Sequence, residues 1–227
     1  MDDDYETISV LIQPKKKSEF VKYLYNRPRQ SKSSLRLIFA HGAGAPMDSE
    51  FMSFIANAIS EHGIEVVRFE FPYMQQRRRT GRKRPPDRMP VLTQCFRDVI
   101  GDLGGASQCV VAGKSMGGRV ASMMLAEQGA VAAVSMGYPF HPLAKPDKLR
   151  SEHWANISKP WLILQGSRDP FGKPDEVSQF PLPSSCRLHW LEDGDHDFKS
   201  LKRSQFSQQE LWALAALTTA NFVIGLE

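Results

Sequence analysis

The chain has 227 residues, of which 41% are hydrophobic and 24% charged, and its formal net charge is +4. These proportions are typical of a soluble globular protein, and a chain this long buries about 70% of its unfolded surface, so it needs no disulfide or structural metal to fold. Three cysteines are too few and too far apart for a disulfide framework or a C-x-x-C metal site. The acidic N-terminus lacks the pattern of a signal peptide, and no segment is long and apolar enough to span a bilayer. We therefore expect a cytoplasmic protein that uses no membrane, metal or cofactor.

Strand and helix patterns alternate along the chain, which predicts a mostly parallel sheet covered by helices on both faces. Short alternating runs at residues 8–12 and 20–24 predict an antiparallel opening hairpin. Apolar residues at helical spacing from Phe51 to Ile59 predict a helix, and Gly63 follows at a typical stop position. We expect further strands at residues 35–40, 64–71, 108–112, 131–136, 161–165 and 188–191, and further helices at 91–103, 117–128 and from 208 onward. The chain shows no repeat or composition break, so residues 1–227 are predicted to form a single domain.

A polar segment between Tyr73 and Pro90 is predicted to be a loop and carries most of the positive charge. Between Arg77 and Arg88 it holds seven basic residues and only one acidic residue, which leaves the rest of the chain slightly acidic. The simplest interpretation is a solvated loop. An electropositive rim that attracts anionic substrates or acidic partners is the alternative. Contact with nucleic acid is disfavoured because the run contains little aromatic interleaving.

Residues 113–117, Gly-Lys-Ser-Met-Gly, match the G-x-S-x-G pattern of a nucleophile elbow. An apolar strand precedes this motif directly and an amphipathic helix pattern follows it, which is the strand–turn–helix context that the elbow requires. Glycine at positions 113 and 117 removes the Cβ atoms that would crowd each other in so sharp a turn. The pattern predicts Ser115 as a nucleophile whose hydroxyl projects above the end of the sheet.

A serine nucleophile needs a base, and the base needs a carboxylate that orients it. His196 lies in a turn just after the last predicted strand, whereas His189 lies within that strand. Asp169 follows the strand at residues 161–165, at the same edge of the sheet as Ser115. The order Ser115, Asp169, His196 is that of this elbow architecture. The rival carboxylates Asp193, Asp195 and Asp197 lie too close in sequence to His196 to orient it easily.

The developing oxyanion requires fixed N–H donors. We expect one from Met116, which follows the nucleophile, and one from Ala43 in the glycine-rich turn after the strand at 35–40. Gly42 of that turn is predicted to contact substrate, and His41 to be structural, with its ring bonded to the turn. Three residues that follow another strand end are predicted to line the acyl pocket: Tyr138, Phe140 and His141.

Five short motifs together resemble the α/β-hydrolase superfamily, and more narrowly its small dienelactone-hydrolase-like group. They are H-G-A-G at 41–44, G-K-S-M-G at 113–117, Y-P-F-H-P at 138–142, G-S-R-D-P-F-G at 166–172 and H-D-F at 196–198. The resemblance implies a three-layer α/β fold and the same triad of Ser115, Asp169 and His196. Dienelactone hydrolases proper use a cysteine nucleophile, so their specific activity is not carried over to this serine. Leu143-Ala144 also departs from the Pro-Gly that such sequences often carry.

These patterns predict a serine hydrolase that cleaves an ester-like bond, a carboxylester or a thioester, through an acyl-enzyme. The insertion before the strand at 161–165 is too short for a large cap domain, which favours an open site and a small-molecule substrate. A non-catalytic binding scaffold and an acyltransferase remain alternatives. The oligomeric state, the acyl chain and the leaving group stay open.

Overall fold

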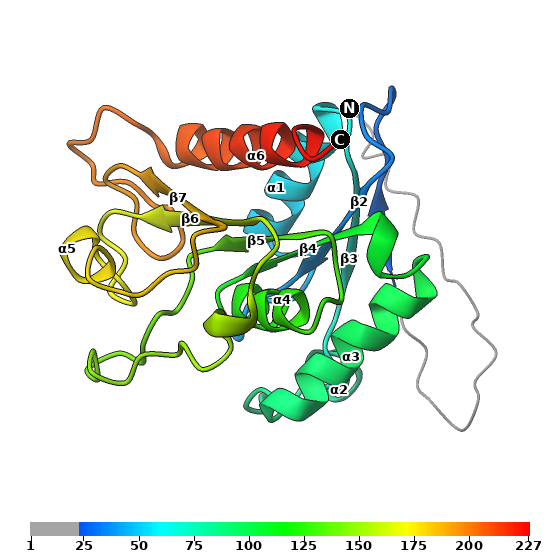
Figure 1. Ribbon diagram of the computed structural model, residues 1–227, viewed down its shortest axis with the longest axis horizontal. Helices are drawn as coiled ribbons and strands as arrows, with labels where there is room; N and C mark the ends of the chain where they lie inside the picture. Colours follow the sequence, from blue (N-terminus) through cyan, green and yellow to red (C-terminus); the bar gives the residue numbers. More distant parts are fainter. Residues whose placement is uncertain (1–22) are drawn as a thin grey trace.

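The computed structural model describes residues 23–227 as a seven-stranded sheet between two layers of helices (Figure 1). The strand order is β1-β3-β2-β4-β5-β6-β7, and every neighbouring pair is parallel except β1 with β3. The strands are β1 (Leu24–Asn26), β2 (Arg36–Ala40), β3 (Glu65–Phe69), β4 (Cys109–Lys114), β5 (Ala132–Met136), β6 (Trp161–Gly166) and β7 (Cys186–Leu191). The α-helices are α1 (Glu50–Glu61), α2 (Pro72–Thr80), α3 (Met89–Asp102), α4 (Met116–Ala126), α5 (Pro174–Val177) and α6 (Gln208–Ile224). The predicted three-layer fold with a mostly parallel sheet is confirmed.

Side chains alternate between the two faces of each central strand, and each face has its own core. Ile38 and Val111 face the cluster beneath α3 and α4, whereas Leu37 and Val110 face the cluster beneath α1 and α6. All four of these side chains are fully buried. A strand buried on both faces must be apolar at nearly every position, which is why these segments read as continuous hydrophobic runs in the sequence.

The register of the parallel strands gathers the predicted site at one edge of the sheet. Ala40 at the end of β2 pairs with Gly113 near the end of β4, and Lys114 pairs with Met136 at the end of β5. The turns that follow β2, β4 and β6 therefore all emerge at the carboxyl edge. Catalytic and binding groups of open α/β sheets collect at this edge.

The loop predicted between Tyr73 and Pro90 needs correction, and the strand predicted at residues 8–12 cannot be compared with the structure. The loop predicted from Tyr73 begins instead with helix α2, in which Pro72 occupies the first turn and Gly81 ends the helix at φ 66° with its N–H bonded to the Arg77 carbonyl. Proline is well suited to a first helical turn, and glycine to a left-handed stop. The predicted strand at 8–12 lies outside the described residues, and β1 pairs with β3.

None of the described connections contains a separate cap domain. The longest connection, residues 70–108 between β3 and β4, contains only α2, α3 and a 3₁₀ turn, and residues 137–160 between β5 and β6 contain only the 3₁₀ turn Trp154–Asn156. The carboxyl edge of the sheet is therefore not roofed by an inserted domain in this part of the chain.

Candidate active site

The turn between β4 and α4 is a strained elbow that carries Ser115 at its tip. Ser115 has φ 51° and ψ −116°, a backbone conformation that costs about 1–3 kcal/mol for a residue other than glycine. A Cβ on Gly113 would lie 2.1 Å from the carbonyl carbon of Gly117. A Cβ on Gly117 would instead lie 2.6 Å from the carbonyl oxygens of Ala40 and His41. The two glycines thus permit two different close approaches: one closes the elbow, and the other seats α4 against the end of β2.

The turn after β7 projects His196 toward the elbow. His196 Nε2 lies 2.9 Å from the Ser115 hydroxyl, and its Nδ1 lies 2.8 Å from Asp169 Oδ2. The backbone of this turn packs against β6 so closely that a Cβ on Gly166 would lie 2.4 Å from the Asp195 carbonyl oxygen. Asp195 also shapes the turn, because its carboxylate accepts hydrogen bonds from the N–H groups of Asp197 and Lys199. The imidazole is half-buried, with 21% of its side chain exposed.

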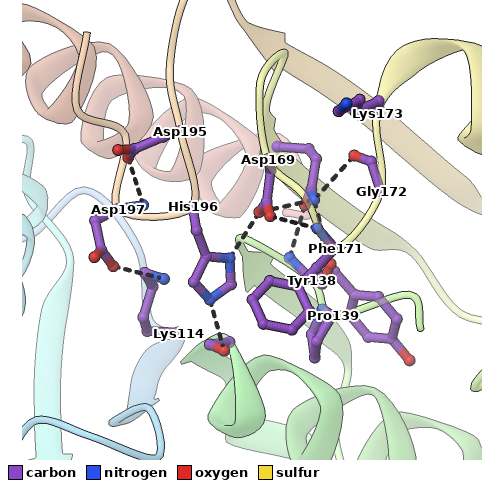
Figure 2. Close-up of polar contacts among 12 residues, drawn as sticks. Lys114, Tyr138, Pro139, Asp169, Phe171, Gly172, Lys173, Asp195, His196 and Asp197 are labelled. Atoms are coloured by element: carbon purple, nitrogen blue, oxygen red, sulfur yellow. Dashed lines mark hydrogen bonds and ion pairs between the residues drawn. The ribbon is translucent and has the colours of Figure 1, made fainter. Parts of the chain in front are cut away.

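Asp169 is fully buried, and both of its oxygens accept hydrogen bonds. Oδ2 accepts from His196 and from the Gln165 amide nitrogen at 3.0 Å, while Oδ1 accepts from the Phe171 N–H at 2.9 Å. The same Gln165 side chain bonds the backbone of Tyr138 through both its oxygen and its nitrogen (Figure 2). Gln165 therefore links the acid to the strand end of β5, and this role was missed in the sequence.

The imidazole is fixed on its flank as well as at both nitrogens. The ring of Phe171 lies 4.5 Å from the ring of His196, with an interplanar angle of 48° (Figure 2). With Asp169 accepting the Nδ1 proton, Nε2 is free to accept from the serine hydroxyl. A neutral imidazole in this tautomer is the form that can remove a proton from Ser115.

The glycine-rich turn after β2 lies beside the elbow. A Cβ on Gly42 would lie 3.7 Å from the Cβ of Ser115. The Gly42 carbonyl accepts from the Tyr73 hydroxyl at 3.1 Å and lies 2.7 Å from His41 Nδ1, and the Ala43 carbonyl accepts from Tyr73 at 3.0 Å. Because a trans peptide points its C=O and N–H in opposite directions, the Ala43 N–H points away from Tyr73. Met116 begins helix α4, so its N–H has no acceptor within the helix.

His41 has the structural position that the sequence predicted. Its Nε2 accepts from the Phe71 N–H at 3.1 Å, so its Nδ1 carries the proton and donates it to the Gly42 carbonyl. Burial lowers the pKa of His41 to about 4, with smaller contributions from the nearby arginines. The ring is therefore neutral at physiological pH and ties the glycine-rich turn to the segment before α2.

The three residues predicted to line an acyl pocket lie in the protein interior instead. Tyr138 and Phe140 are fully buried and pack with Trp154 in an aromatic cluster. His141 is only 3% exposed, and its Nδ1 lies 3.0 Å from the Pro142 carbonyl. The prediction failed because residues that follow a strand end can turn back into the core, and the aromatic rings here do so.

A buried lysine stands next to the nucleophile and had no role in the sequence analysis. Lys114 Nζ lies 3.1 Å from Asp197 Oδ1, and only 8% of the lysine side chain is exposed. Burial lowers the pKa of Lys114, while Asp197, Asp169 and Asp195 oppose that shift. A G-x-S-x-G match alone cannot reveal this contact, because Asp197 comes from a turn far along the chain.

The basic segment from Arg77 to Arg88 is partly engaged in ion pairs. Arg78 binds both Asp48 and the buried Glu70, and Arg84 pairs with Asp87 within the segment. The ion pairs of Arg78 hold α2 against the protein body, whereas residues 81–86 are exposed, as expected of a solvated loop.

Residues 23–227 contain no group of three or more histidine, cysteine, aspartate and glutamate side chains that could hold a metal ion. Within the same residues, no helix has both the length and the apolar character needed to cross a membrane.

Comparison with known proteins shows which family the chain belongs to. The chain is similar to the dienelactone hydrolase of Anabaena variabilis (19% identity, 95% of this chain and 94% of that one, TM-score 0.67). It is also similar to Est1E of Butyrivibrio proteoclasticus (11%, 91% and 94%, TM-score 0.66) and to a serine hydrolase without a lid from Xanthomonas campestris (18%, 88% and 87%, TM-score 0.61). The α/β-hydrolase domain family matches residues 33–224, and the chain therefore belongs to that family.

Proposed function

We propose that this protein is a serine hydrolase that cleaves a small carboxylester or thioester through an acyl-enzyme. The observation that carries the proposal is the continuous chain of hydrogen bonds from Ser115 through His196 to Asp169, at 2.9 and 2.8 Å. The position of Ser115 on a strained elbow at the carboxyl edge of the sheet supports the same assignment. The similarity to a dienelactone hydrolase and to a lidless serine hydrolase is consistent with it.

In the proposed reaction, Ser115 Oγ attacks the carbonyl carbon while His196 Nε2 takes the hydroxyl proton. Asp169 keeps the Nδ1 proton on the opposite side of the ring and stabilises the imidazolium that forms. His196 then donates the proton to the leaving oxygen or sulfur as the tetrahedral intermediate collapses. Water, deprotonated by His196, then attacks the acyl carbon, and His196 returns that proton to Ser115 Oγ as the bond to the serine breaks and the acid product leaves.

The negative oxygen of the tetrahedral intermediate needs donors that are already in place. The N–H of Met116 lies at the positive end of the α4 dipole. The N–H of Ala43 is the proposed second donor, oriented by the hydrogen bonds that Tyr73 makes to the two neighbouring carbonyls. Removing one such donor typically reduces kcat by about 10²–10³-fold. Gly42 is proposed to lie against the substrate, since its Cα faces the nucleophile without a side chain.

The test combines labelling and turnover. The wild-type protein is expected to react covalently with a fluorophosphonate and to hydrolyse p-nitrophenyl acetate, and Ser115→Ala is expected to do neither. Ser122→Ala is the matched control, because it removes a serine hydroxyl from the next turns of α4 without touching the elbow. A wild-type protein that is folded but unlabelled would contradict the proposal and favour a binding scaffold.

A further inference from the structure

We propose that Lys114 and Asp197 form a positioning pair that holds the base His196 in line with Ser115 and balances the negative charge around its ring. This inference rests on the proposed function and deepens it by adding two residues that act through the base. Neither residue touches the reacting atoms, so both are positioning residues.

The pair runs alongside the hydrogen bond that it supports. Lys114 directly precedes Ser115, and Asp197 directly follows His196. The 3.1 Å contact between Lys114 Nζ and Asp197 Oδ1 therefore forms a second link beside the 2.9 Å link between Ser115 and His196 (Figure 2). Two adjacent links fix the relative rotation of two segments, whereas a single link leaves the rotation free.

Other contacts already attach the turn that carries His196, residues 192–199 and here called the base turn, to the rest of the fold. The ion pair is therefore not needed to keep this turn folded, and its role is to orient the turn against the elbow. The Asp195 carboxylate accepts two backbone N–H groups within the turn, and the Trp212 indole on α6 donates to the Asp197 carbonyl at 2.9 Å. These contacts fix the turn against α6 but do not join it to the elbow. Among residues 23–227, two polar side-chain contacts join the elbow to this turn: the ion pair of Lys114 with Asp197 and the hydrogen bond of Ser115 with His196.

The ammonium group also lies close to the ring of the base. A Cβ on Gly137 would be 3.2 Å from Lys114 Nζ and 3.3 Å from His196 Nδ1, so both nitrogens border the same small space. The ring of Phe51 on α1 lies 5.7 Å from Nζ on another side. The charged groups that act on the ammonium are Asp197, Asp169 and Asp195, all of which favour its charged form, and the imidazole of His196 borders the same space.

Burying a lysine is unfavourable, which argues that the charge is retained for a purpose. The side chain is 8% exposed at the end of a strand whose other side chains are apolar, whereas its partner Asp197 is 72% exposed. An apolar residue would fill this position without any loss of solvation. A positive charge there offsets part of the negative charge that Asp169 and Asp197 place around the ring of His196.

Three variants separate positioning from general stability. Lys114→Met keeps most of the aliphatic chain but removes the charge, Asp197→Asn keeps the shape of its partner, and Asp197→Glu retains a carboxylate at an exposed position. Arg97→Met is the control, because it removes a cation from an exposed ion pair with Glu127 that is unrelated to the site. Each variant is measured for fluorophosphonate labelling rate, for kcat and KM with p-nitrophenyl acetate, and for thermal unfolding.

We expect Lys114→Met and Asp197→Asn to lower kcat by about tenfold to a hundredfold, the range that a small misplacement of a catalytic group produces, with little change in KM. Asp197→Glu should recover most of the loss, and Arg97→Met should behave as wild type. The acidic limb of the pH profile should move to higher pH in Lys114→Met, because a cation near the base is lost. It should move to lower pH in Asp197→Asn, because an anion near the base is lost. A purely structural role would not produce opposite shifts.

Each result of these measurements bears on a stated part of the proposal. Equal labelling rates and kcat in wild type and Asp197→Asn would overturn the inference, even if Lys114→Met proves too unstable to purify. Loss of activity in both variants with neither opposite pH shifts nor recovery in Asp197→Glu would also overturn the inference, because a purely structural role explains that result. A wild-type protein that is not labelled at all would refute the proposed function, and the inference would fall with it.

Discussion

Replacing Asp169 with asparagine tests the site most severely, because the change keeps the size of the side chain and alters only its hydrogen-bonding capacity. In the wild type, Oδ1 faces one donor, the Phe171 N–H, and Oδ2 faces two, from His196 and Gln165. Asparagine offers only one acceptor oxygen, and its amide group must point its own protons at one of these two sets of donors.

Neither orientation of the new amide preserves the site. If its oxygen stays on the Phe171 N–H, the NH₂ group faces His196 Nδ1, which must then give up its proton. The proton moves to Nε2, and the ring can no longer accept from Ser115. If the oxygen faces His196 instead, the NH₂ group meets the Phe171 N–H, and that buried donor loses its partner at a cost of about 1–3 kcal/mol. The first orientation is favoured, because the side chains of His196 and Gln165 can adjust and the backbone N–H cannot.

The expected loss in kcat is about 10⁴-fold, the size of effect that a wrong base tautomer produces in a serine triad. Turnover of p-nitrophenyl acetate measures it, and thermal unfolding checks the fold, for which about 2–4 °C is expected per kcal/mol lost. Asp193→Asn is the matched control: it removes a carboxylate from the same base turn at φ 58°, a conformation that asparagine tolerates. If Asp169→Asn retained more than a tenth of the wild-type kcat while Asp193→Asn lost activity, Asp169 would not be the orienting acid.

Three further outcomes follow from the contacts around the elbow. Gly117→Ala should lower the free energy of unfolding measured in urea by about 1–3 kcal/mol, because its Cβ would lie 2.6 Å from the carbonyl oxygens of Ala40 and His41; an unchanged urea midpoint would contradict the close approach. Tyr73→Phe removes the hydroxyl that donates to the Gly42 and Ala43 carbonyls. It should lower kcat about tenfold by loosening the glycine-rich turn, while the protein still reacts with the fluorophosphonate. His41 has a folded pKa of about 4 against about 6.5 unfolded, so its contribution to stability is complete above pH 6.5 and is lost as the pH falls toward 4. That contribution is about 3 kcal/mol, and His41→Gln should flatten the pH dependence of the unfolding free energy over this range; a parallel curve would argue against it.

The parts of the site that the sequence predicted are those encoded by local pattern. The elbow is a short segment in which the position of Gly113 and Gly117 around Ser115 follows from backbone sterics alone. Asp169 and His196 were found because each follows a predicted strand, and parallel strands end at one edge. The structure brings these three side chains into one hydrogen-bonded chain, and their catalytic roles remain the proposal above.

The parts that the sequence did not reveal depend on contacts between distant segments. Gln165 looked like an ordinary residue at the end of a buried strand, yet its amide joins Asp169 to the backbone after β5. Tyr73 fell in a segment read as loop, because its arginine-rich composition concealed helix α2. Tyr138 and Phe140 were assigned to a pocket because they follow a strand end, and no local pattern shows whether such side chains turn outward or inward.

Close backbone contacts explain how the site can hold its geometry without a cap domain. The elbow, the glycine-rich turn and the turn that carries His196 follow three different strands, β4, β2 and β7, and side-chain contacts alone would allow each of them to shift. Instead a Cβ at Gly117 would strike the end of β2, a Cβ at Gly166 would strike the base turn, and a Cβ at Gly137 would lie 2.9 Å from the His196 carbonyl oxygen. Contacts between two backbone segments involve no side-chain rotamers. The separation between Ser115 and His196 is therefore set by the positions of the strands. The ion pair of Lys114 with Asp197 then only needs to fix the small remaining rotation, which is why a single surface carboxylate can be expected to alter kcat.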